Sequence, residues 1–160
     1  MGGILPMGNF YQFGYLASDI DAAERSLGEL YGITKVRRKR ASEWMETLHA
    51  WTGDTMVEVI VCGPGAPSIY TNQPLPVAGN LMLHHLGRRI LDEGTWHQME
   101  QAARQRGLCT EMMGSVMNGQ LRYAYVDTRA MLGVYTEYVM LSGDALHIYD
   151  DVPQNDLQVS

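Results

Sequence analysis

The chain has 160 residues, of which 46% are hydrophobic and 19% charged, the composition of a globular domain. Its net charge of -6 argues against nucleic-acid or anionic-membrane partners, because both need a basic surface. No apolar run approaches the roughly 20 residues that cross a bilayer, the start lacks the basic flank of a signal peptide, and two cysteines make no disulfide framework, so we expect a cytoplasmic protein.

Hydrophobic periodicity predicts one order of elements twice: a strand, a helix and three further strands. Strand-like alternation at 10–17 leads into apolar residues three and four apart that end at Gly32, and the same sequence of patterns returns from residue 81. The expected strands are 10–17, 34–39, 43–51 and 55–62, then 81–90, 108–113, 116–127 and 133–141. Turns are expected at Gly53-Asp54, Gly114, Asn118-Gly119 and Gly133.

Capping residues and loop composition set the expected boundaries. Asp19 and Asp92 each follow a first strand, where a short side-chain oxygen can accept backbone donors of a helix, and Gly107 can end the second helix. The expected organisation is a lead-in at 1–9, a first module at 10–64, a Pro- and Gly-rich linker at 65–80, a second module at 81–141 and a tail at 142–160. We expect the tail to be frayed, with an arm or lid as the alternative.

The first strand of each module carries a polar residue two positions before a glycine. These residues are Gln12, before Gly14, and His85, before Gly87. Neighbouring side chains of a strand point to opposite faces, so only one histidine of the pair His84-His85 can face a cavity. We take His84 as structural and His85 as the candidate ligand.

The last strand of each module has a glutamate in its middle, Glu58 and Glu137. Two ionised carboxylates in one buried site would cost several kcal/mol each, and their repulsion would make one take a proton. A divalent cation removes both problems, and oxygen ligands mixed with imidazole suit Zn, Ni, Co or Mn rather than Ca. For each residue taken alone, a satisfied core position or a wet strand face is the alternative.

Four stretches together resemble the vicinal oxygen chelate superfamily, which includes glyoxalase I, methylmalonyl-CoA epimerase, extradiol dioxygenases and bleomycin-resistance proteins. They are Gln12-Phe13-Gly14, Val57-Glu58-Val59-Ile60, His84-His85-Leu86-Gly87, and Tyr123–Asp127 with Gly133–Tyr138. The resemblance implies an α+β fold of two βαβββ modules whose curled mixed sheets form a cup. It also implies a small-molecule substrate and, with exposed sheet edges, a homodimer.

The resemblance further implies that Gln12, Glu58, His85 and Glu137 hold a divalent metal, a set most similar to that of glyoxalase I. A single histidine in the set disfavours an oxygenase, whose triad has two. Leu16 and Cys62 stand where glyoxalase I has its glutathione contacts, so a glutathione thioester is not implied.

The implied activity is that of a metal-dependent lyase or isomerase, glyoxalase- or epimerase-like, that chelates adjacent substrate oxygens and moves a proton through a stabilised enolate. By analogy with the family Glu137 is the expected base, with Glu58 as the alternative and Glu43 and Glu46 as further candidates. The alternative is a metal-free protein that sequesters a flat apolar ligand, as bleomycin-resistance proteins do. His49 is expected to pack, with a place lining the cup as the alternative.

The basic run Lys35–Arg40 has two interpretations. It is either a solvated strand edge or a contact for an anionic substrate tail.

Overall fold

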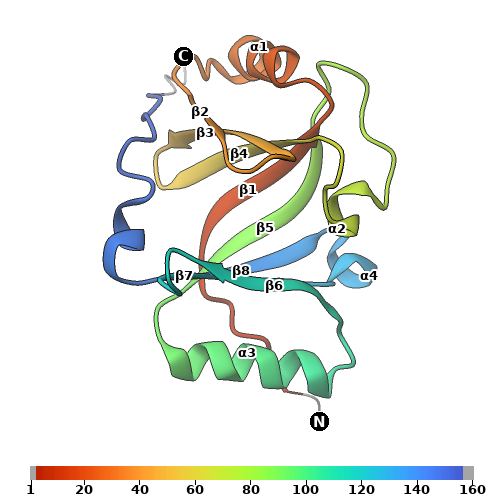
Figure 1. Ribbon diagram of the computed structural model, residues 1–160, viewed down its shortest axis with the longest axis vertical. Helices are drawn as coiled ribbons and strands as arrows, with labels where there is room; N and C mark the ends of the chain where they lie inside the picture. The colour runs from red at the N-terminus through yellow and green to blue at the C-terminus, as the bar shows by residue number, and fades with distance from the viewer. Residues whose placement is uncertain (1–2, 157–160) are drawn as a thin grey trace. The chain divides into compact units, whose positions relative to one another are not determined.

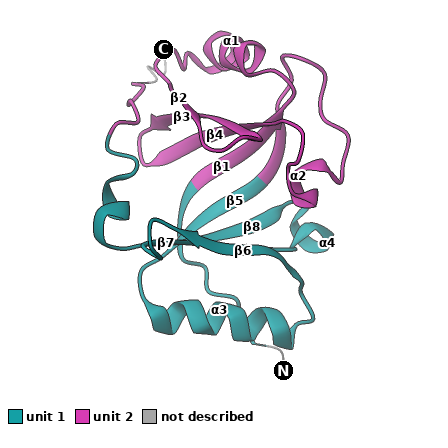
Figure 2. Cartoon of the chain, viewed as in Figure 1, with its two compact units in different colours: residues 1–11, 85–150 teal, residues 12–84, 151–160 magenta. Residues whose placement is uncertain are grey.

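The structure is a computed structural model that describes residues 3–156, so the end of the expected tail lies outside the described residues (Figure 1). The chain is α+β and divides into two compact units (Figure 2). We call the unit made of residues 12–84 with the segment from 151 the Glu58 unit, and the unit made of 85–150 with the segment up to 11 the Glu137 unit. No helix in 3–156 is long and apolar enough to cross a membrane.

The Glu58 unit is a four-stranded sheet with one long helix on one face. Its elements are β1 (Asn9–Ala17), α1 (Ile20–Tyr31), β2 (Arg37–Arg40), β3 (Met45–Thr52), β4 (Thr55–Cys62) and α2 (Ser68–Thr71). The strand order is β2-β3-β4-β1, antiparallel except for the parallel pair β1 and β4. The apolar stripe of α1 packs Ala23 and Leu27 with Leu48 of β3 and Val59 of β4, all buried.

Local chemistry fixes both ends of α1. The Asp19 carboxylate accepts a hydrogen bond from the backbone of Ala22 at 2.7 Å, and Gly32 ends the helix at φ 68°. The β3–β4 hairpin turns at Gly53, whose φ of 61° suits the first central position of a tight two-residue turn.

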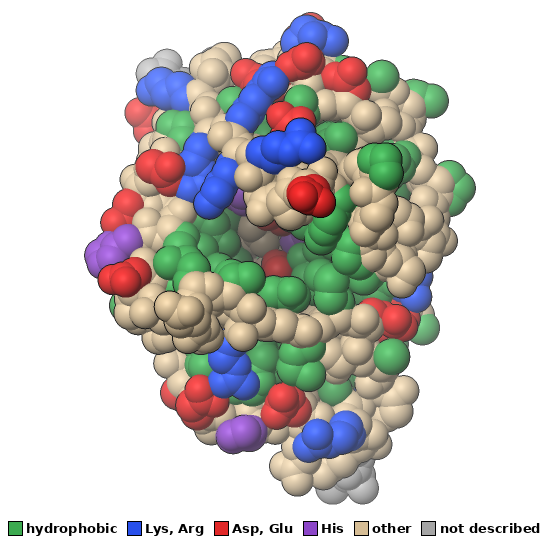
Figure 3. Space-filling view, viewed as in Figure 1, with side chains coloured by type: hydrophobic (Ala, Val, Ile, Leu, Met, Phe, Trp, Pro, Cys, Tyr) green, Lys and Arg blue, Asp and Glu red, His purple; other side chains and the backbone are tan. Residues whose placement is uncertain are grey.

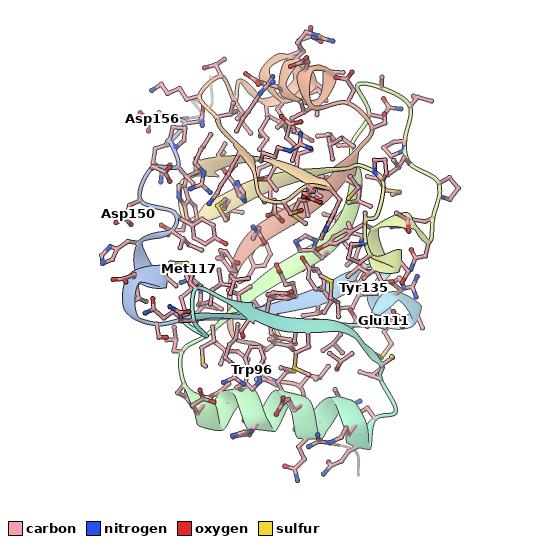
Figure 4. The ribbon with its side chains drawn as sticks, viewed as in Figure 1. Trp96, Glu111, Met117, Tyr135, Asp150 and Asp156 are labelled. Atoms are coloured by element: carbon pink, nitrogen blue, oxygen red, sulfur yellow. The ribbon has the colours of Figure 1, made fainter. Side chains whose placement is uncertain are left out.

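The Glu137 unit repeats the plan. Its elements are β5 (Met82–Ile90), α3 (Glu93–Gln105), β6 (Thr110–Val116), β7 (Leu121–Val126), α4 (Arg129–Leu132), β8 (Tyr135–Leu141) and the 3-10 helix η1 (Gly143–His147). The strand order is β5-β8-β7-β6, with β5 and β8 parallel. Trp96 and Met99 of α3 are buried against Ala124 and Tyr138 of the sheet, and Figure 4 shows Trp96 between helix and strands. The expected fold class is confirmed.

The sequence prediction was wrong at Gly114. We expected a turn, but β6 continues through this residue. A Cβ built on Gly114 would lie 2.6 Å from the hydroxyl oxygen of Tyr123, so the glycine allows a close approach of a large side chain from β7. The turn follows at Met117, Asn118 and Gly119, all with positive φ.

Two short helices were missed. The linker, which we expected to be loop, contains α2, and α4 precedes β8. Each has four residues, too few to give a helical period in the sequence.

The tail is docked through Asp156 and is not frayed as expected. Val152 and Asn155 are buried, and the backbone of Trp51 exchanges hydrogen bonds with Pro153 and Asn155 at 2.9 and 2.8 Å. The Asn155 side chain accepts from the backbone N–H groups of Thr34 and Lys35. The Asn155 amide therefore bonds two backbone N–H groups just before β2 that are not paired in the sheet. A lone asparagine in a polar segment does not reveal this role in the sequence.

Candidate active site

In the Glu58 unit, strand alternation separates the helix-packed face from the face that carries the predicted ligands. Val57 and Val59 of β4 lie toward α1, so Glu58 lies on the opposite face. Gly14 of β1 pairs in register with Glu58, and Gln12 lies two residues before it on the same face. The unit therefore places two of the four predicted ligands on one face.

Glu58 is held by a histidine that the sequence analysis assigned to packing. His49 is the direct cross-strand neighbour of Glu58, and its Nε2 lies 3.0 Å from Glu58 Oε1. Arg37 Nη2 lies 3.3 Å from Nδ1 of the same ring. His49 thus belongs to the site face, where it contacts a candidate ligand directly.

The hairpin turn is the signal that could have found His49. A two-residue turn at Gly53-Asp54 pairs Thr52 with Thr55, and counting equally outwards along both strands pairs His49 with Glu58. The turn lies where the sequence predicted it, and His49 and Glu58 lie on the expected strands, but the prediction did not extend to the register between them.

Gln12 is 1% exposed, and its side-chain oxygen has no hydrogen-bond partner among the described residues. Buried amide oxygens are nearly always bonded, because leaving one without a partner costs about 1–3 kcal/mol. An oxygen in this state is suited to accept a bond from a cation or a bound ligand.

In the Glu137 unit, β5 and β8 bring the other two predicted ligands together. His85 is fully buried, and its Nε2 lies 3.4 Å from Glu137 Oε2. Tyr125 of β7 is the cross-strand neighbour of Glu137, and its ring meets the His85 ring edge-on at 5.2 Å. Gly87 pairs in register with Glu137 as Gly14 does with Glu58.

Tyr11 lies near Glu137 and keeps its proton. Burial raises the pKa of Tyr11 well above its ordinary value, and the negative potentials of Tyr149 and Glu137 raise it further. The Arg89 guanidinium lies 4.7 Å from the centre of the Tyr11 ring and partly offsets these effects. The Tyr11 hydroxyl is therefore a hydrogen-bond donor at neutral pH rather than a base.

His84 is structural, as expected. Its Nε2 lies 2.9 Å from the Ile69 carbonyl oxygen, and its ring stacks on Tyr70 at 5.2 Å. The backbone of α2 therefore holds the histidine that alternation places opposite His85.

The further candidates for a base lie away from the Glu58 face. Glu46 shares its β3 face with Leu48, which packs toward α1, and Glu43 is exposed in the bend before the strand. Both line a shallow surface pocket with Cys62, and burial raises the pKa of the Cys62 thiol to about 11. This pocket therefore holds no thiolate nucleophile at neutral pH.

The donor atoms fit a divalent cation where the structure places them together. Two donors bound to one tetrahedral ion at about 2.1 Å lie about 3.4 Å apart, the spacing of His85 Nε2 and Glu137 Oε2. Within 3–156, no cluster of three or more His, Cys, Asp or Glu is close enough to hold a metal. Each unit thus contributes a pair, Gln12 with Glu58 and His85 with Glu137, and a joint quartet stays a prediction.

Comparisons with known proteins extend to structure only. Neither a family model nor a curated protein matches the sequence. Three solved structures illustrate the similarity: a Streptomyces coelicolor methylmalonyl-CoA epimerase variant with 2-nitronate-propionyl-CoA, the Mycobacterium tuberculosis methylmalonyl-CoA epimerase, and a hypothetical protein from Bacillus halodurans.

The Streptomyces structure has 16% identity and a TM-score of 0.60, over 86% of this chain and 100% of the other. The Mycobacterium structure has 15% identity and a TM-score of 0.60, over 88% and 94%. The Bacillus structure has 14% identity and a TM-score of 0.58, over 86% and 96%. The chain therefore shares the glyoxalase-like fold of these structures, the fold that the sequence motifs indicated.

Proposed function

We propose that the protein is a metal-dependent isomerase of the epimerase type, acting on a carbon acid whose acyl group presents two adjacent oxygens. Proteins of similar structure are methylmalonyl-CoA epimerases, one of them in complex with methylmalonyl-CoA and NH4+. Lyase chemistry of the glyoxalase kind would use the same groups, but these neighbours favour proton transfer at the α-carbon without cleavage of a bond between heavy atoms.

The observation that carries the proposal is the repeated placement of a shielded carboxylate. Glu58 and Glu137 each stand opposite a glycine of the first strand of their module, on the face away from the long helix. Gln12 adds a buried oxygen without a hydrogen-bond partner in the described part of the chain. Shielding such groups from water costs several kcal/mol unless hydrogen bonds or a nearby charge compensate, and a bound cation would supply that charge.

Gln12, Glu58, His85 and Glu137 are the residues that would hold the cation. A divalent metal there supplies Lewis-acid charge, which stabilises the negative charge that develops on an acyl oxygen when the neighbouring carbon loses its proton.

Glu137 is the residue that we assign to proton transfer. Its carboxylate takes the α-proton, and inversion at carbon requires that a proton then reach the opposite face of the enolate from a second acid. The Tyr11 hydroxyl, whose raised pKa keeps it neutral, does not compete as a base. Val139 and Tyr135, buried on the same face of β8, exclude water from the strand on either side.

Metal content and proton exchange test the proposal together. Purified protein should hold one equivalent of Zn, Ni, Co or Mn, and should exchange the α-proton of a methylmalonyl thioester in D2O. Glu58→Ala and His85→Ala should lose the metal, whereas His97→Ala, at an exposed site on α3, should keep it. Absence of metal in the wild type, with ligand binding unchanged in the first two variants, would support the sequestering function instead.

We also propose a homodimer. Among the described residues, β6 ends the strand order of the Glu137 unit and exposes Met113 and Val116. Light scattering on the purified protein tests this, and a mass of 17.9 kDa in solution contradicts it.

A further inference from the structure

A row of side chains runs from the C-terminal segment to Glu58 across three strands. Asp151 forms an ion pair with Arg37, Arg37 contacts His49 Nδ1, and His49 Nε2 contacts Glu58 Oε1. The sheet register makes this row direct, because Arg37 pairs with His49 across β2 and β3, and His49 pairs with Glu58 across β3 and β4.

Exposure falls from Asp151 to His49. The Asp151 side chain is 71% exposed, that of Arg37 14%, that of His49 7% and that of Glu58 13%. Electrostatic contacts at the buried end are therefore shielded less by water than the ion pair at the surface. Basic side chains gather over β2 on the face shown in Figure 3, and Arg37 is the member of that strand that contacts the site histidine.

Arg37 and Glu58 together indicate which ring nitrogen of His49 carries the proton. A guanidinium has only donors, so Arg37 donates and His49 Nδ1 must accept. The proton then sits on Nε2, from which it is donated to the carboxylate of Glu58 at 3.0 Å. In this arrangement the contact with Arg37 selects the tautomer of His49 whose Nε2–H donates a hydrogen bond to Glu58.

The backbone around the row is held by the C-terminal segment. Asn155 Oδ1 accepts from the backbone of Thr34 and Lys35 at 3.1 and 3.0 Å, just before β2, and its Nδ2 donates to the Lys35 carbonyl at 2.8 Å. The same segment bonds the backbone of Trp51, two residues after His49. Asp151 thus meets Arg37 from a segment anchored on both neighbouring strands.

We infer that Arg37, held by Asp151, is a positioning residue that fixes Glu58 through His49. Hydrogen-bonded partners of a metal-binding carboxylate hold it in place, and their loss typically lowers metal affinity 10–100-fold. The inference deepens the proposed function, and it rests on that function only for what Glu58 does once it is fixed.

The imidazole proton of His49 gives a readout that needs no metal. In the metal-free protein, a 1H–15N spectrum should show a His49 Nε2–H signal protected from exchange, assigned by its loss in His49→Gln. Arg37→Met should remove this protection, with exchange at least ten-fold faster. Arg38→Met is the matched control, because Arg38 is next in β2 but pairs with Asp21 and Glu24 of α1.

Variants along the row refine the test. Arg37→Lys, which keeps a donor, should recover part of the protection, and Asp151→Asn should lose part of it while the melting temperature stays near that of the wild type. A His49 signal equally protected in Arg37→Met, or not protected in the wild type, would overturn the inference.

Zinc titration of the metal-free protein separates this inference from the proposed function. His49→Gln should weaken zinc binding about 10–100-fold and Arg37→Met by a smaller factor, with Arg38→Met unchanged. If the wild type binds none of Zn, Ni, Co and Mn, the proposed function fails, while the His49 signal still tests the positioning. If Arg37→Met loses the signal but binds zinc as tightly as the wild type, positioning has no effect on the site and the inference fails.

Discussion

The two units place their glutamates in the same way. Glu58 stands in register with Gly14, and Glu137 with Gly87, so neither first strand adds a side chain beside the carboxylate. Each glutamate lies on the last strand of its module, which pairs in parallel with the first strand. The repeated scaffold therefore supplies two equivalent positions for a charged group.

The antiparallel neighbour on the other side makes the two positions different. Glu58 faces His49, which donates a hydrogen bond at 3.0 Å, whereas Glu137 faces Tyr125, whose ring packs edge-on against His85. The antiparallel neighbour of Glu58 is therefore a histidine that donates to it, whereas the histidine near Glu137, His85 at 3.4 Å, comes from β5 and the antiparallel neighbour is a tyrosine. The comparison teaches that the duplicated fold gives the two carboxylates equivalent placement, while their side-chain neighbours differ.

The sharpest way to break this comparison is to replace each glutamate by glutamine. Glu137→Gln should lower the rate of α-proton exchange about 10²–10⁴-fold, because the amide cannot take the proton. Glu58→Gln keeps an oxygen that accepts from His49, so its main loss should be in metal affinity. Exchange of a methylmalonyl thioester in D2O at rising zinc concentration measures both.

Rescue by zinc distinguishes the two roles. Activity should return toward the wild-type rate in Glu58→Gln at high zinc and should stay low in Glu137→Gln. Equal rescue of both variants would show that the two carboxylates share one role, against the asymmetry of their neighbours.

A smaller effect is expected from Asn155→Ala, which tests whether the C-terminal segment supports only the Glu58 unit. The variant leaves the backbone groups of Thr34 and Lys35 without their partner and should lower the free energy of unfolding by about 1–3 kcal/mol in urea. The NMR signal of His49 should shift while that of His85 stays in place. Asp156→Ala, at the exposed next residue, is the control.

A change below about 0.5 kcal/mol for Asn155→Ala would mean that the hydrogen bonds of the segment are replaced by water. In that case the tail is not what holds β2 beside β3.

The sequence was sufficient for the repeated elements because each has its own period. Alternation identified β4 and β5 and placed His84 and His85 on opposite faces, and three-and-four spacing identified α1 and α3. Short helices of four residues left no period, and Gly114 gave the same sequence signal as a turn residue. Local patterns therefore predicted the elements but not every break between them.

The candidate site was harder to predict from the sequence, because the contacts that distinguish Glu58 from Glu137 are made between neighbouring strands. His49 contacts Glu58 only through the register of a hairpin, and Arg37 joins them through β2, whose start was placed three residues too early. Asp151 reaches Arg37 from a segment that composition marked as solvated. Contacts of this kind depend on pairing between distant residues, which single-strand patterns do not contain.

The smallest expected effect concerns the helix cap of the Glu137 unit, Asp92. The Asp92 carboxylate accepts from the Thr95 backbone N–H at 2.8 Å and from its hydroxyl at 2.9 Å, and these bonds lower the pKa of Asp92. A lowered pKa means that the cap stabilises the fold above the ordinary value of about 3.9, and that this contribution is lost as pH falls through the lowered value. Asp92→Ala should therefore melt a few degrees below the wild type at pH 7, with the gap closing in acid. The difference in melting temperature between Asp92→Asn, an uncharged cap, and Asp92→Ala should not change with pH. A difference between the wild type and Asp92→Ala that persists unchanged to pH 2 would show that the carboxylate charge adds nothing to α3.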